Sequence, residues 1–194
     1  MSRWLPRSFA RLGTLTWLVG MLLVGTALLA KHVVALPVPS ADEQLARAAA
    51  SLRGASDRGR WLAIHVLYAD CRCSQRIVTH LITSERPAGV HELVLWVGSQ
   101  APASELVRRM RVQSVTATQL AQMGISAAPL LMVLDPEDQL RYVGGYSERK
   151  QGPQIDDLQI LAGARQGQSV AAHPLFGCAV SERLKQQLTL LKGL

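Results

Sequence analysis

The stretch WLAIHVLYADCRCSQRIVTHLITS, residues 61–84, decides how we interpret this chain. It opens with an apolar run at 61–68, which is typical of a strand buried on both faces. It closes with apolar residues at helical spacing between 77 and 82. Cys71 and Cys73 lie between these runs, where a strand gives way to a helix. A thiol near the N-terminal end of a helix has a lowered pKa, so we expect a reactive cysteine here rather than two packing residues.

The composition narrows the classes of function. The chain has 194 residues and 48% of them are apolar, which is enough for one domain with a hydrophobic core. The net charge is +7, but without the four basic residues that flank the N-terminal apolar segment, the chain has 17 basic and 14 acidic residues. The basic residues are scattered rather than clustered on one surface, so we expect no nucleic-acid partner. Three cysteines, at 71, 73 and 178, leave an odd count that suits redox or metal chemistry better than a structural disulfide framework.

A run of 19 residues without a charge, 12–30, lies near the N-terminus. Its length is about that needed to cross a bilayer core, and the arginines upstream predict a cytoplasmic N-terminus. We expect a retained single-pass anchor in the inner (cytoplasmic) membrane, with a cleaved signal peptide as the alternative. Either way the rest of the chain would lie in the periplasm, where disulfides persist. The predicted organisation is a cytoplasmic tip, transmembrane helix and tether over 1–39, then a folded domain over 40–194.

The folded part shows alternating helix and strand patterns. Strands are expected at 61–68, 91–97 and 112–115. Helices are expected at 41–52, 103–110, 118–123, 155–165 and 181–191, besides the cysteine helix. Pro129 leads into an apolar run at 130–134, and a polar turn separates that run from a second short strand pattern. Residues 130–143 therefore predict an antiparallel hairpin.

This order of strand, cysteine helix, strand, helix, proline, hairpin and helix resembles the thioredoxin fold over residues 61–165. The expected fold class is a three-layer α/β thioredoxin-like fold with an N-terminal transmembrane helix and a C-terminal helical extension. In that family a cis-proline faces the active cysteines, and the resemblance places Pro129 there. The chain departs from the family motif, because one residue separates Cys71 from Cys73 and Ser74 stands where the second cysteine would be.

The Cys-x-Cys-Ser pattern, together with the Phe-Gly-Cys at 176–178, is similar to a little-characterised group of membrane-tethered bacterial thioredoxin-like proteins. Some members of this group are called RedB-like, and others carry only a domain of unknown function. The resemblance implies a fold and a topology. It does not imply a substrate.

Three mechanisms remain open for the cysteines. In thiol–disulfide exchange, Cys71 is the nucleophile, Cys73 its local partner, a protein thiol or disulfide the substrate, and no cofactor is needed. Residues two apart in a helix point apart, so a Cys71–Cys73 bond requires Cys71 to lie before the helix proper. In the second mechanism Cys178 is a distant resolving thiol. In the third, a copper chaperone holds Cu(I) on the three cysteines, with His173 as the best histidine candidate.

Two further residues are candidates for the site. Pro129 is expected to shape the wall that faces the substrate. Asp70 is expected either to cap the cysteine helix or, if it is buried with a raised pKa, to assist proton transfer. A tethered interaction module without turnover is another alternative for the whole protein. The sequence sets neither the oligomeric state nor the direction of electron flow.

Overall fold

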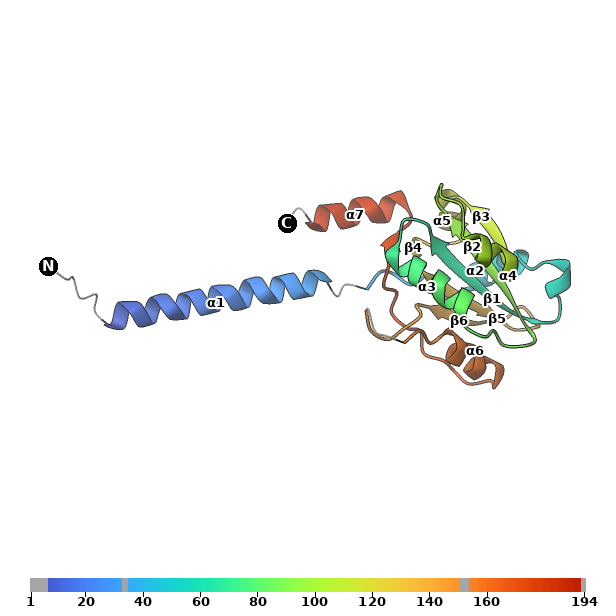
Figure 1. The fold of residues 1–194 in the computed structure, drawn as a ribbon, viewed down its shortest axis with the longest axis horizontal. Helices are drawn as coiled ribbons and strands as arrows, with labels where there is room; N and C mark the ends of the chain where they lie inside the picture. Colours follow the sequence, from blue (N-terminus) through green and yellow to red (C-terminus); the bar gives the residue numbers. More distant parts are fainter. Residues whose placement is uncertain (1–6, 33–34, 151–153, 193–194) are drawn as a thin grey trace. The chain divides into compact units, whose positions relative to one another are not determined.

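The computed structural model describes residues 7–32, 35–150 and 154–192 (Figure 1). The chain divides into two compact units, Met1–Val34 and Ala35–Leu194. The helix described in the first unit is α1 (Arg7–His32). The second unit contains the sheet and the cysteines, and the rest of the architecture concerns this unit alone.

The N-terminal helix corrects one sequence-based prediction. Among the residues that the structure describes, no helix combines the length and the apolar character needed to cross a membrane. The predictions of a transmembrane helix and of a single-pass location in the inner membrane are therefore wrong. The structure gives no support to the predicted placement of the folded domain in the periplasm.

A five-stranded mixed sheet forms the centre of the second unit, with the strand order β3-β2-β1-β5-β6. Its strands are β1 (Trp61–Tyr68), β2 (Val90–Val97), β3 (Arg111–Val115), β5 (Leu130–Leu134) and β6 (Leu140–Gly144). β1, β2 and β3 run parallel, whereas β5 is antiparallel to both β1 and β6. The predicted hairpin is thus present. Because Leu130 pairs with Val66, the start of β5 lies beside the end of β1, where the cysteines follow.

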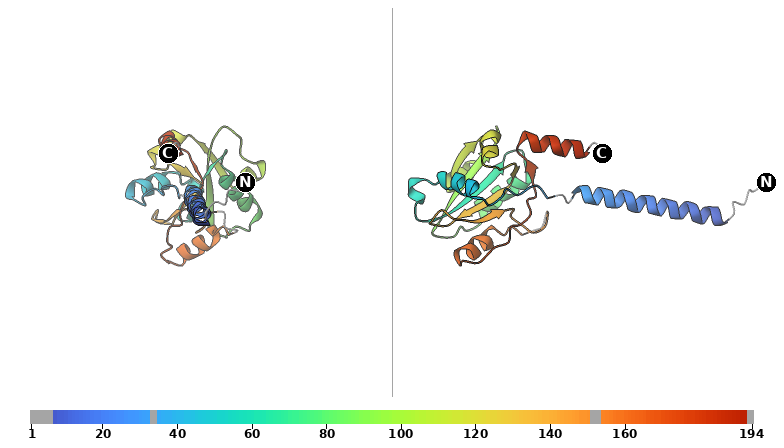
Figure 2. Two further views of the ribbon diagram at one scale, coloured as in Figure 1. Left: turned by 90° about the vertical axis from the view of Figure 1, so that its left-hand side faces the viewer. Right: turned by 180° about the vertical axis from the view of Figure 1, so that it is seen from behind.

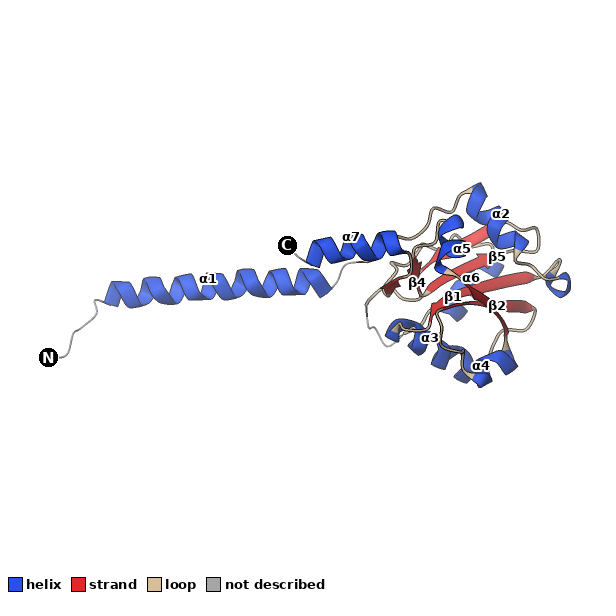
Figure 3. Cartoon of the chain, turned by 90° about the horizontal axis from the view of Figure 1, so that it is seen from above, coloured by secondary structure: helices blue, strands red, loops and turns tan. Residues whose placement is uncertain are grey.

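Helices cover both faces of this sheet. They are α2 (Glu43–Ser51), α3 (Arg72–Thr83), α4 (Ser104–Arg109), α5 (Ala117–Gln122), α6 (Asp157–Arg165) and α7 (Glu182–Lys192). In Figure 3, α2 and α5 lie on one side of the strands and α3 and α4 on the other, and Figure 2 shows α5 and α6 on opposite sides of the sheet. α2 begins two residues later than predicted, because the Asp42 carboxylate caps it by accepting a hydrogen bond from the Leu45 amide at 2.9 Å.

The alternation of side chains in β1 explains the three layers. Leu62, Ile64 and Val66 point into the core shared with α2 and α5, whereas Ala63 and Leu67 point into the core shared with α3, α4 and α6. All five side chains are completely buried. A strand that is apolar at every position must have both faces covered, so this run of sequence requires helices above and below it. The result is a thioredoxin-like α/β architecture.

A second, very small sheet was not predicted. β4 (Ala127–Ala128) pairs antiparallel with β7 (Cys178–Ala179), and Ala128 lies opposite Cys178. β4 ends immediately before Pro129, and the Ala128–Pro129 peptide bond is cis, as the resemblance implied. This pairing brings the C-terminal segment to the end of β1.

A line of polar side chains crosses the core behind β1. The His65 Nδ1 atom is 2.8 Å from the Tyr146 hydroxyl, and its Nε2 atom is 3.8 Å from Glu92 Oε1. Arg86 forms ion pairs with Glu92 at 2.5 Å and with Asp157 at 2.8 Å. Burial raises the pKa of Glu92, but the hydrogen bonds and charges of His65 and Arg86 outweigh burial and lower that pKa to about 2. Glu92 is therefore charged in the core, and the network holds Tyr146 under the candidate site.

The contribution of Arg86 to the free energy of unfolding is testable. In an Arg86→Met variant, Glu92 and Asp157 would be buried without their common partner, so we expect the free energy of unfolding to fall by about 3–5 kcal/mol. Urea unfolding at pH 7 measures this. The control is Arg108→Met, whose ion pair with Glu105 is exposed, and where we expect a loss of no more than about 1 kcal/mol. Equal losses in the two variants would contradict the structural role of the buried network.

Candidate active site

The turn from β1 into α3 sets the position of the first cysteine. Cys71 is the N-cap of α3, with extended backbone angles of φ −104° and ψ 116°. Its amide donates to the Tyr68 carbonyl at 3.1 Å, and its carbonyl accepts from the Gln75 amide at 3.0 Å. Cys71 thus lies before the helix proper, while Cys73 lies in the first turn. This is the arrangement that a close approach of the two thiols requires.

The structure brings three of the predicted residues to Cys71. Its Sγ atom lies 3.8 Å from the Ala128 carbonyl oxygen, directly before Pro129. Cys178 lies opposite Ala128 in the β4–β7 pair, and the thiols of Cys73 and Cys178 both form hydrogen bonds with Cys71. All three cysteines are free thiols. The site therefore combines residues from the start of α3, the entry to β5 and the C-terminal segment.

The pKa values of the three thiols are shifted in opposite directions. The hydrogen bond from Cys178 is the largest cause that lowers the pKa of Cys71, followed by the hydrogen bond from Cys73. Burial opposes these effects, and the amide and hydroxyl of Ser74 add to them. The hydrogen bond to Cys71 is also the largest cause that raises the pKa of Cys73 and of Cys178, and burial raises both further. Cys71 therefore has the lowest pKa of the three thiols, and the pKa values of its two neighbours are raised.

The most acidic thiol is also the least accessible. Cys71 is 0% exposed, whereas Cys73 and Cys178 are half-buried. Cys73 lines a pocket of about 230 Å³, together with Pro129 and Phe176. The pocket has apolar walls, and two exposed arginines of α3 also line it. An external group can therefore approach Cys73 through this pocket, but it cannot reach Cys71 while the C-terminal segment lies over it.

Asp70 does not take either of the positions expected for it. The N-cap of α3 is Cys71, so Asp70 does not cap the helix. Its side chain is exposed and accepts a hydrogen bond from the Gln100 amide group at 3.2 Å, so the burial that a proton-transfer role requires is not met. Its catalytic role stays a prediction without geometric support.

Ser74 occupies the position at which the family has its second cysteine, and it acts within the fold. The side chain is completely buried, and its hydroxyl oxygen accepts a hydrogen bond from the Tyr68 amide at 3.0 Å. This bond ties the end of β1 to the first turn of α3. A serine here therefore stabilises the junction between β1 and α3.

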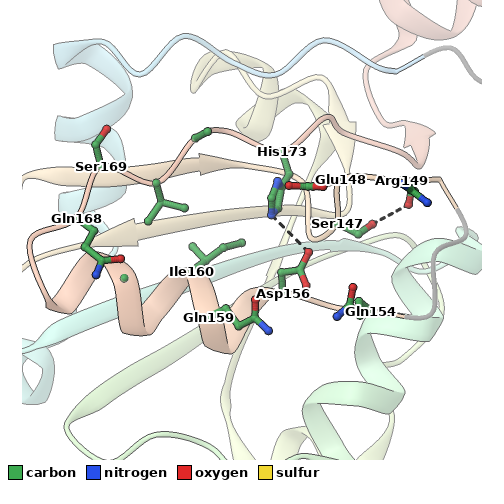
Figure 4. A pocket seen from close by; sticks show the side chains of 13 residues that line it. Ser147, Glu148, Arg149, Gln154, Asp156, Gln159, Ile160, Gln168, Ser169 and His173 are labelled. Atoms are coloured by element: carbon green, nitrogen blue, oxygen red, sulfur yellow. Dashed lines mark hydrogen bonds and ion pairs between the residues drawn. The ribbon is translucent and has the colours of Figure 1, made fainter.

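His173 lies in a different pocket, of about 780 Å³, which Figure 4 shows from close by. Its Nε2 atom is 3.4 Å from Asp156 Oδ2, and its ring packs edge-on against Tyr142. No cysteine is among the residues that line this pocket. Within the described ranges, no group of three or more cysteine, histidine and acidic side chains could hold a metal ion. The copper site with His173 stays a prediction.

Sequence reasoning missed Ala128 and Gly177 as parts of the site, and it favoured a solvated loop for Tyr146 over a place in the site wall. Gly177 lies close against the Ala128 carbonyl, directly before β7, and Tyr146 lines the pocket beside Cys73. A glycine directly before the last cysteine was the one available signal, because glycine permits a close approach of two backbones. The buried position of Tyr146 could not be derived from the local sequence, because it depends on the distant partner His65.

Comparison with known proteins gives structural likeness only. No known family model matches the chain, and no curated protein matches it. An uncharacterized conserved protein from Geobacillus kaustophilus is similar, with a TM-score of 0.52 at 14% identity over 77% of this chain and 91% of that one. A hypothetical protein from Sinorhizobium meliloti has a TM-score of 0.51 at 15% identity, with the same coverage of both chains. These two likenesses show the fold alone.

A third similar structure has a name that refers to redox chemistry. It is a candidate thiol-disulfide oxidoreductase from Bacteroides vulgatus, with a TM-score of 0.39 at 16% identity, covering 58% of this chain and 78% of that one. The chain's own strand order, cis-proline and cysteine helix are those of a thioredoxin-like fold. Its particular feature is a site with three thiols.

The hydrogen bonds among the three thiols predict how the pKa of Cys71 changes in cysteine variants, and this change can be measured by absorbance without a reagent. We expect one thiolate per chain at pH 7, seen by its absorbance near 240 nm, and none at pH 7 in Cys71→Ser. Cys178→Ala should raise the pKa of Cys71 more than Cys73→Ala does, because Cys178 supplies the larger lowering effect. The reverse order, or a thiolate that persists in Cys71→Ser, would contradict the assignment.

Proposed function

We propose that the protein is a thiol–disulfide oxidoreductase of thioredoxin-like type, with Cys71 as its nucleophile and a thiol or disulfide of another protein as its substrate. One observation supports this most: the thiols of Cys73 and Cys178 both form hydrogen bonds with Cys71 and lower its pKa. Packing alone would not need Cys178, from a distant part of the chain, beside Cys71 and Cys73. The thiolate is the form of cysteine that exchanges disulfides.

The reaction in the reducing direction has two steps. The Cys71 thiolate attacks one sulfur of a substrate disulfide, so that a Cys71–substrate bond forms, the substrate S–S bond breaks, and the leaving sulfur takes up a proton. A second thiol of this chain then loses its proton and attacks the Cys71 sulfur, which releases the second substrate sulfur as a thiol. Two electrons pass to the substrate, and the protein is left with one internal disulfide. The oxidising direction is the same sequence in reverse.

Cys178 is the better candidate for the second thiol. Its hydrogen bond has the larger effect on Cys71, and it belongs to a segment that approaches from across the small sheet. Cys73 is only two residues from Cys71, and a disulfide over so short a span strains the backbone. Pro129 adjoins the carbonyl that faces the Cys71 sulfur, so it would form the wall on the substrate side. Cys73 lines the pocket from which the substrate would enter.

The test uses the full chain and three single variants, Cys71→Ser, Cys73→Ser and Cys178→Ser, with a short disulfide-bonded peptide as substrate. We expect Cys71→Ser to lower the exchange rate at least about a hundredfold, because the nucleophile is gone. Cys178→Ser should accumulate a mixed disulfide between Cys71 and the peptide, which mass spectrometry after acid quenching detects. Cys73→Ser should retain turnover.

Two outcomes would contradict this proposal. Exchange at an unchanged rate in Cys71→Ser would show that Cys71 is not the nucleophile. A mixed disulfide that accumulates in Cys73→Ser but not in Cys178→Ser would assign the resolving step to Cys73 instead. All four proteins are compared at equal folded fractions, determined by circular dichroism.

A further inference from the structure

The two thiols beside Cys71 adjoin different parts of the protein surface. Cys73 lines the pocket of about 230 Å³ from which the substrate would enter. Cys178 is also half-buried, but it is not one of the residues that line this pocket. Cys71 lies between the two and is 0% exposed. In the proposed reducing reaction the protein ends with a Cys71–Cys178 disulfide, and an external thiol must reduce this disulfide before the next turnover.

The two sulfurs of that disulfide differ as points of attack. The bond to Cys178 keeps the C-terminal segment over Cys71, so an external thiol does not reach the buried sulfur of Cys71. The sulfur of Cys178 belongs to a half-buried residue. Attack on Cys178 makes Cys71 the leaving group, and a thiol with a lower pKa leaves faster. Access and the ease of leaving therefore favour attack on the same sulfur.

The start of α3 stabilises a departing Cys71 thiolate even when Cys178 is bonded to it. Cys71 is the N-cap of a helix of 12 residues, and the positive N-terminal end of a helix favours a negative sulfur. A sulfur of Cys178 that is part of a disulfide has no proton to share. Of the two hydrogen bonds between thiols that lower the pKa of Cys71, the one with Cys73 then remains. Cys73 is thus placed to act on the leaving sulfur.

We propose that an external dithiol reduces the protein by attacking Cys178, and that Cys73 remains a thiol throughout and stabilises the Cys71 thiolate as it leaves. The inference rests on the proposed function, because that reaction supplies the Cys71–Cys178 disulfide. Cys178 is then a catalytic residue in both halves of the cycle, first as the resolving thiol and then as the sulfur that receives the reductant. Cys73 is a positioning residue, since it acts through Cys71.

The reduction consists of two exchanges. A thiolate of the dithiol attacks the Cys178 sulfur, so that a bond between the dithiol and Cys178 forms, the Cys71–Cys178 bond breaks, and Cys71 leaves as a thiolate. The second thiol of the reductant then attacks the reductant sulfur that is bonded to Cys178. This closes a disulfide within the reductant and releases Cys178, which takes up a proton. Two electrons pass to the protein, and the other proton of the dithiol passes to solvent.

Cys73 is accessible from the pocket, but it is the poorer point of entry for electrons. Cys73 would first have to attack Cys71 and form a Cys71–Cys73 disulfide. The two residues are only two apart, and a disulfide over so short a span strains the backbone. This exchange would also expel Cys178, whose pKa is raised, and a thiol with a raised pKa leaves slowly. Direct attack on Cys178 avoids both costs.

The experiment maps the mixed disulfide in the unaltered full chain. Diamide oxidises the chain, and the probe is 2-mercaptoethanol, a thiol that cannot close a disulfide within itself. After acid quenching at early times, N-ethylmaleimide blocks the free thiols, and trypsin places the three cysteines in separate peptides, 61–72, 73–76 and 166–183. We expect mass spectrometry to find at least about tenfold more mercaptoethanol on 166–183 than on either of the other peptides.

Variants at Cys73 test its effect on the leaving sulfur. Cys73→Ala removes the hydrogen bond to Cys71, and we expect 2-mercaptoethanol to reduce its disulfide about three- to tenfold more slowly than that of the unaltered chain. Cys73→Ser keeps a hydroxyl donor and should be slowed less. The matched control is Thr79→Ala, which removes an exposed hydroxyl further along α3 and should be reduced at an unchanged rate.

Three results would overturn the proposal. Mercaptoethanol found mainly on 61–72 or on 73–76 would place the attack on Cys71 or Cys73. A Cys71–Cys73 disulfide as the main product of oxidation by diamide would remove the bond that the dithiol is proposed to attack. Equal reduction rates in Cys73→Ala, Cys73→Ser and Thr79→Ala would remove the role of Cys73. The mapping needs no variant, so its result stands even if a variant does not fold.

Failure of this inference and failure of the proposed function give different results. Peptide exchange that depends on Cys71, with mercaptoethanol mapped to Cys71 or Cys73, leaves the oxidoreductase and removes the entry of electrons at Cys178. Mercaptoethanol mapped to Cys178 after oxidation by diamide, with no exchange of the disulfide-bonded peptide, leaves Cys178 as the point of attack and removes the proposed substrate reaction.

Discussion

The hydrogen bonds that two thiols donate to Cys71 are the interaction on which the rest of the site depends. A buried thiolate is costly unless donors stabilise it, and the end of one helix supplies only part of that stabilisation. The larger contribution comes from Cys178, which is 107 residues further along the chain. The fold meets this requirement through the β4–β7 pair, which fixes the C-terminal segment beside the residue that precedes Pro129. The pKa of Cys71, at the start of α3, therefore depends on the position of Cys178 in the C-terminal segment.

Strand positions were predicted best from the sequence where a buried strand appears as a continuous apolar run. β1 and β5 were predicted at their observed bounds, because an apolar run buried on both faces can be recognised from composition and length alone. The position of Cys71 at the strand-to-helix junction followed from the same run. β4 and β7 were not predicted, since strands of two residues have no periodicity and exist only through their pairing with each other. Cys178 was expected near the site, but its position opposite Ala128 could not be derived.

Two other differences have simple physical causes. A charge-free run at 12–30 suggested a membrane helix, but absence of charge does not by itself make a helix long and apolar enough to cross a membrane, and no helix among the described residues meets both conditions. Asp70 was a candidate because it precedes Cys71 in sequence. The chain turns between β1 and α3, however, and successive side chains in a turn point in different directions. Cys71 therefore points into the core, whereas Asp70 points to solvent and to Gln100.

The hydrogen bond from Cys178 has a consequence for the reactivity of Cys71. A thiolate loses intrinsic nucleophilicity as its pKa falls, so Cys71 is weakest as a nucleophile while this hydrogen bond is present. Loss of the hydrogen bond would remove the largest cause that lowers the pKa of Cys71, and that pKa would rise toward the ambient pH, where an attacking thiol works best.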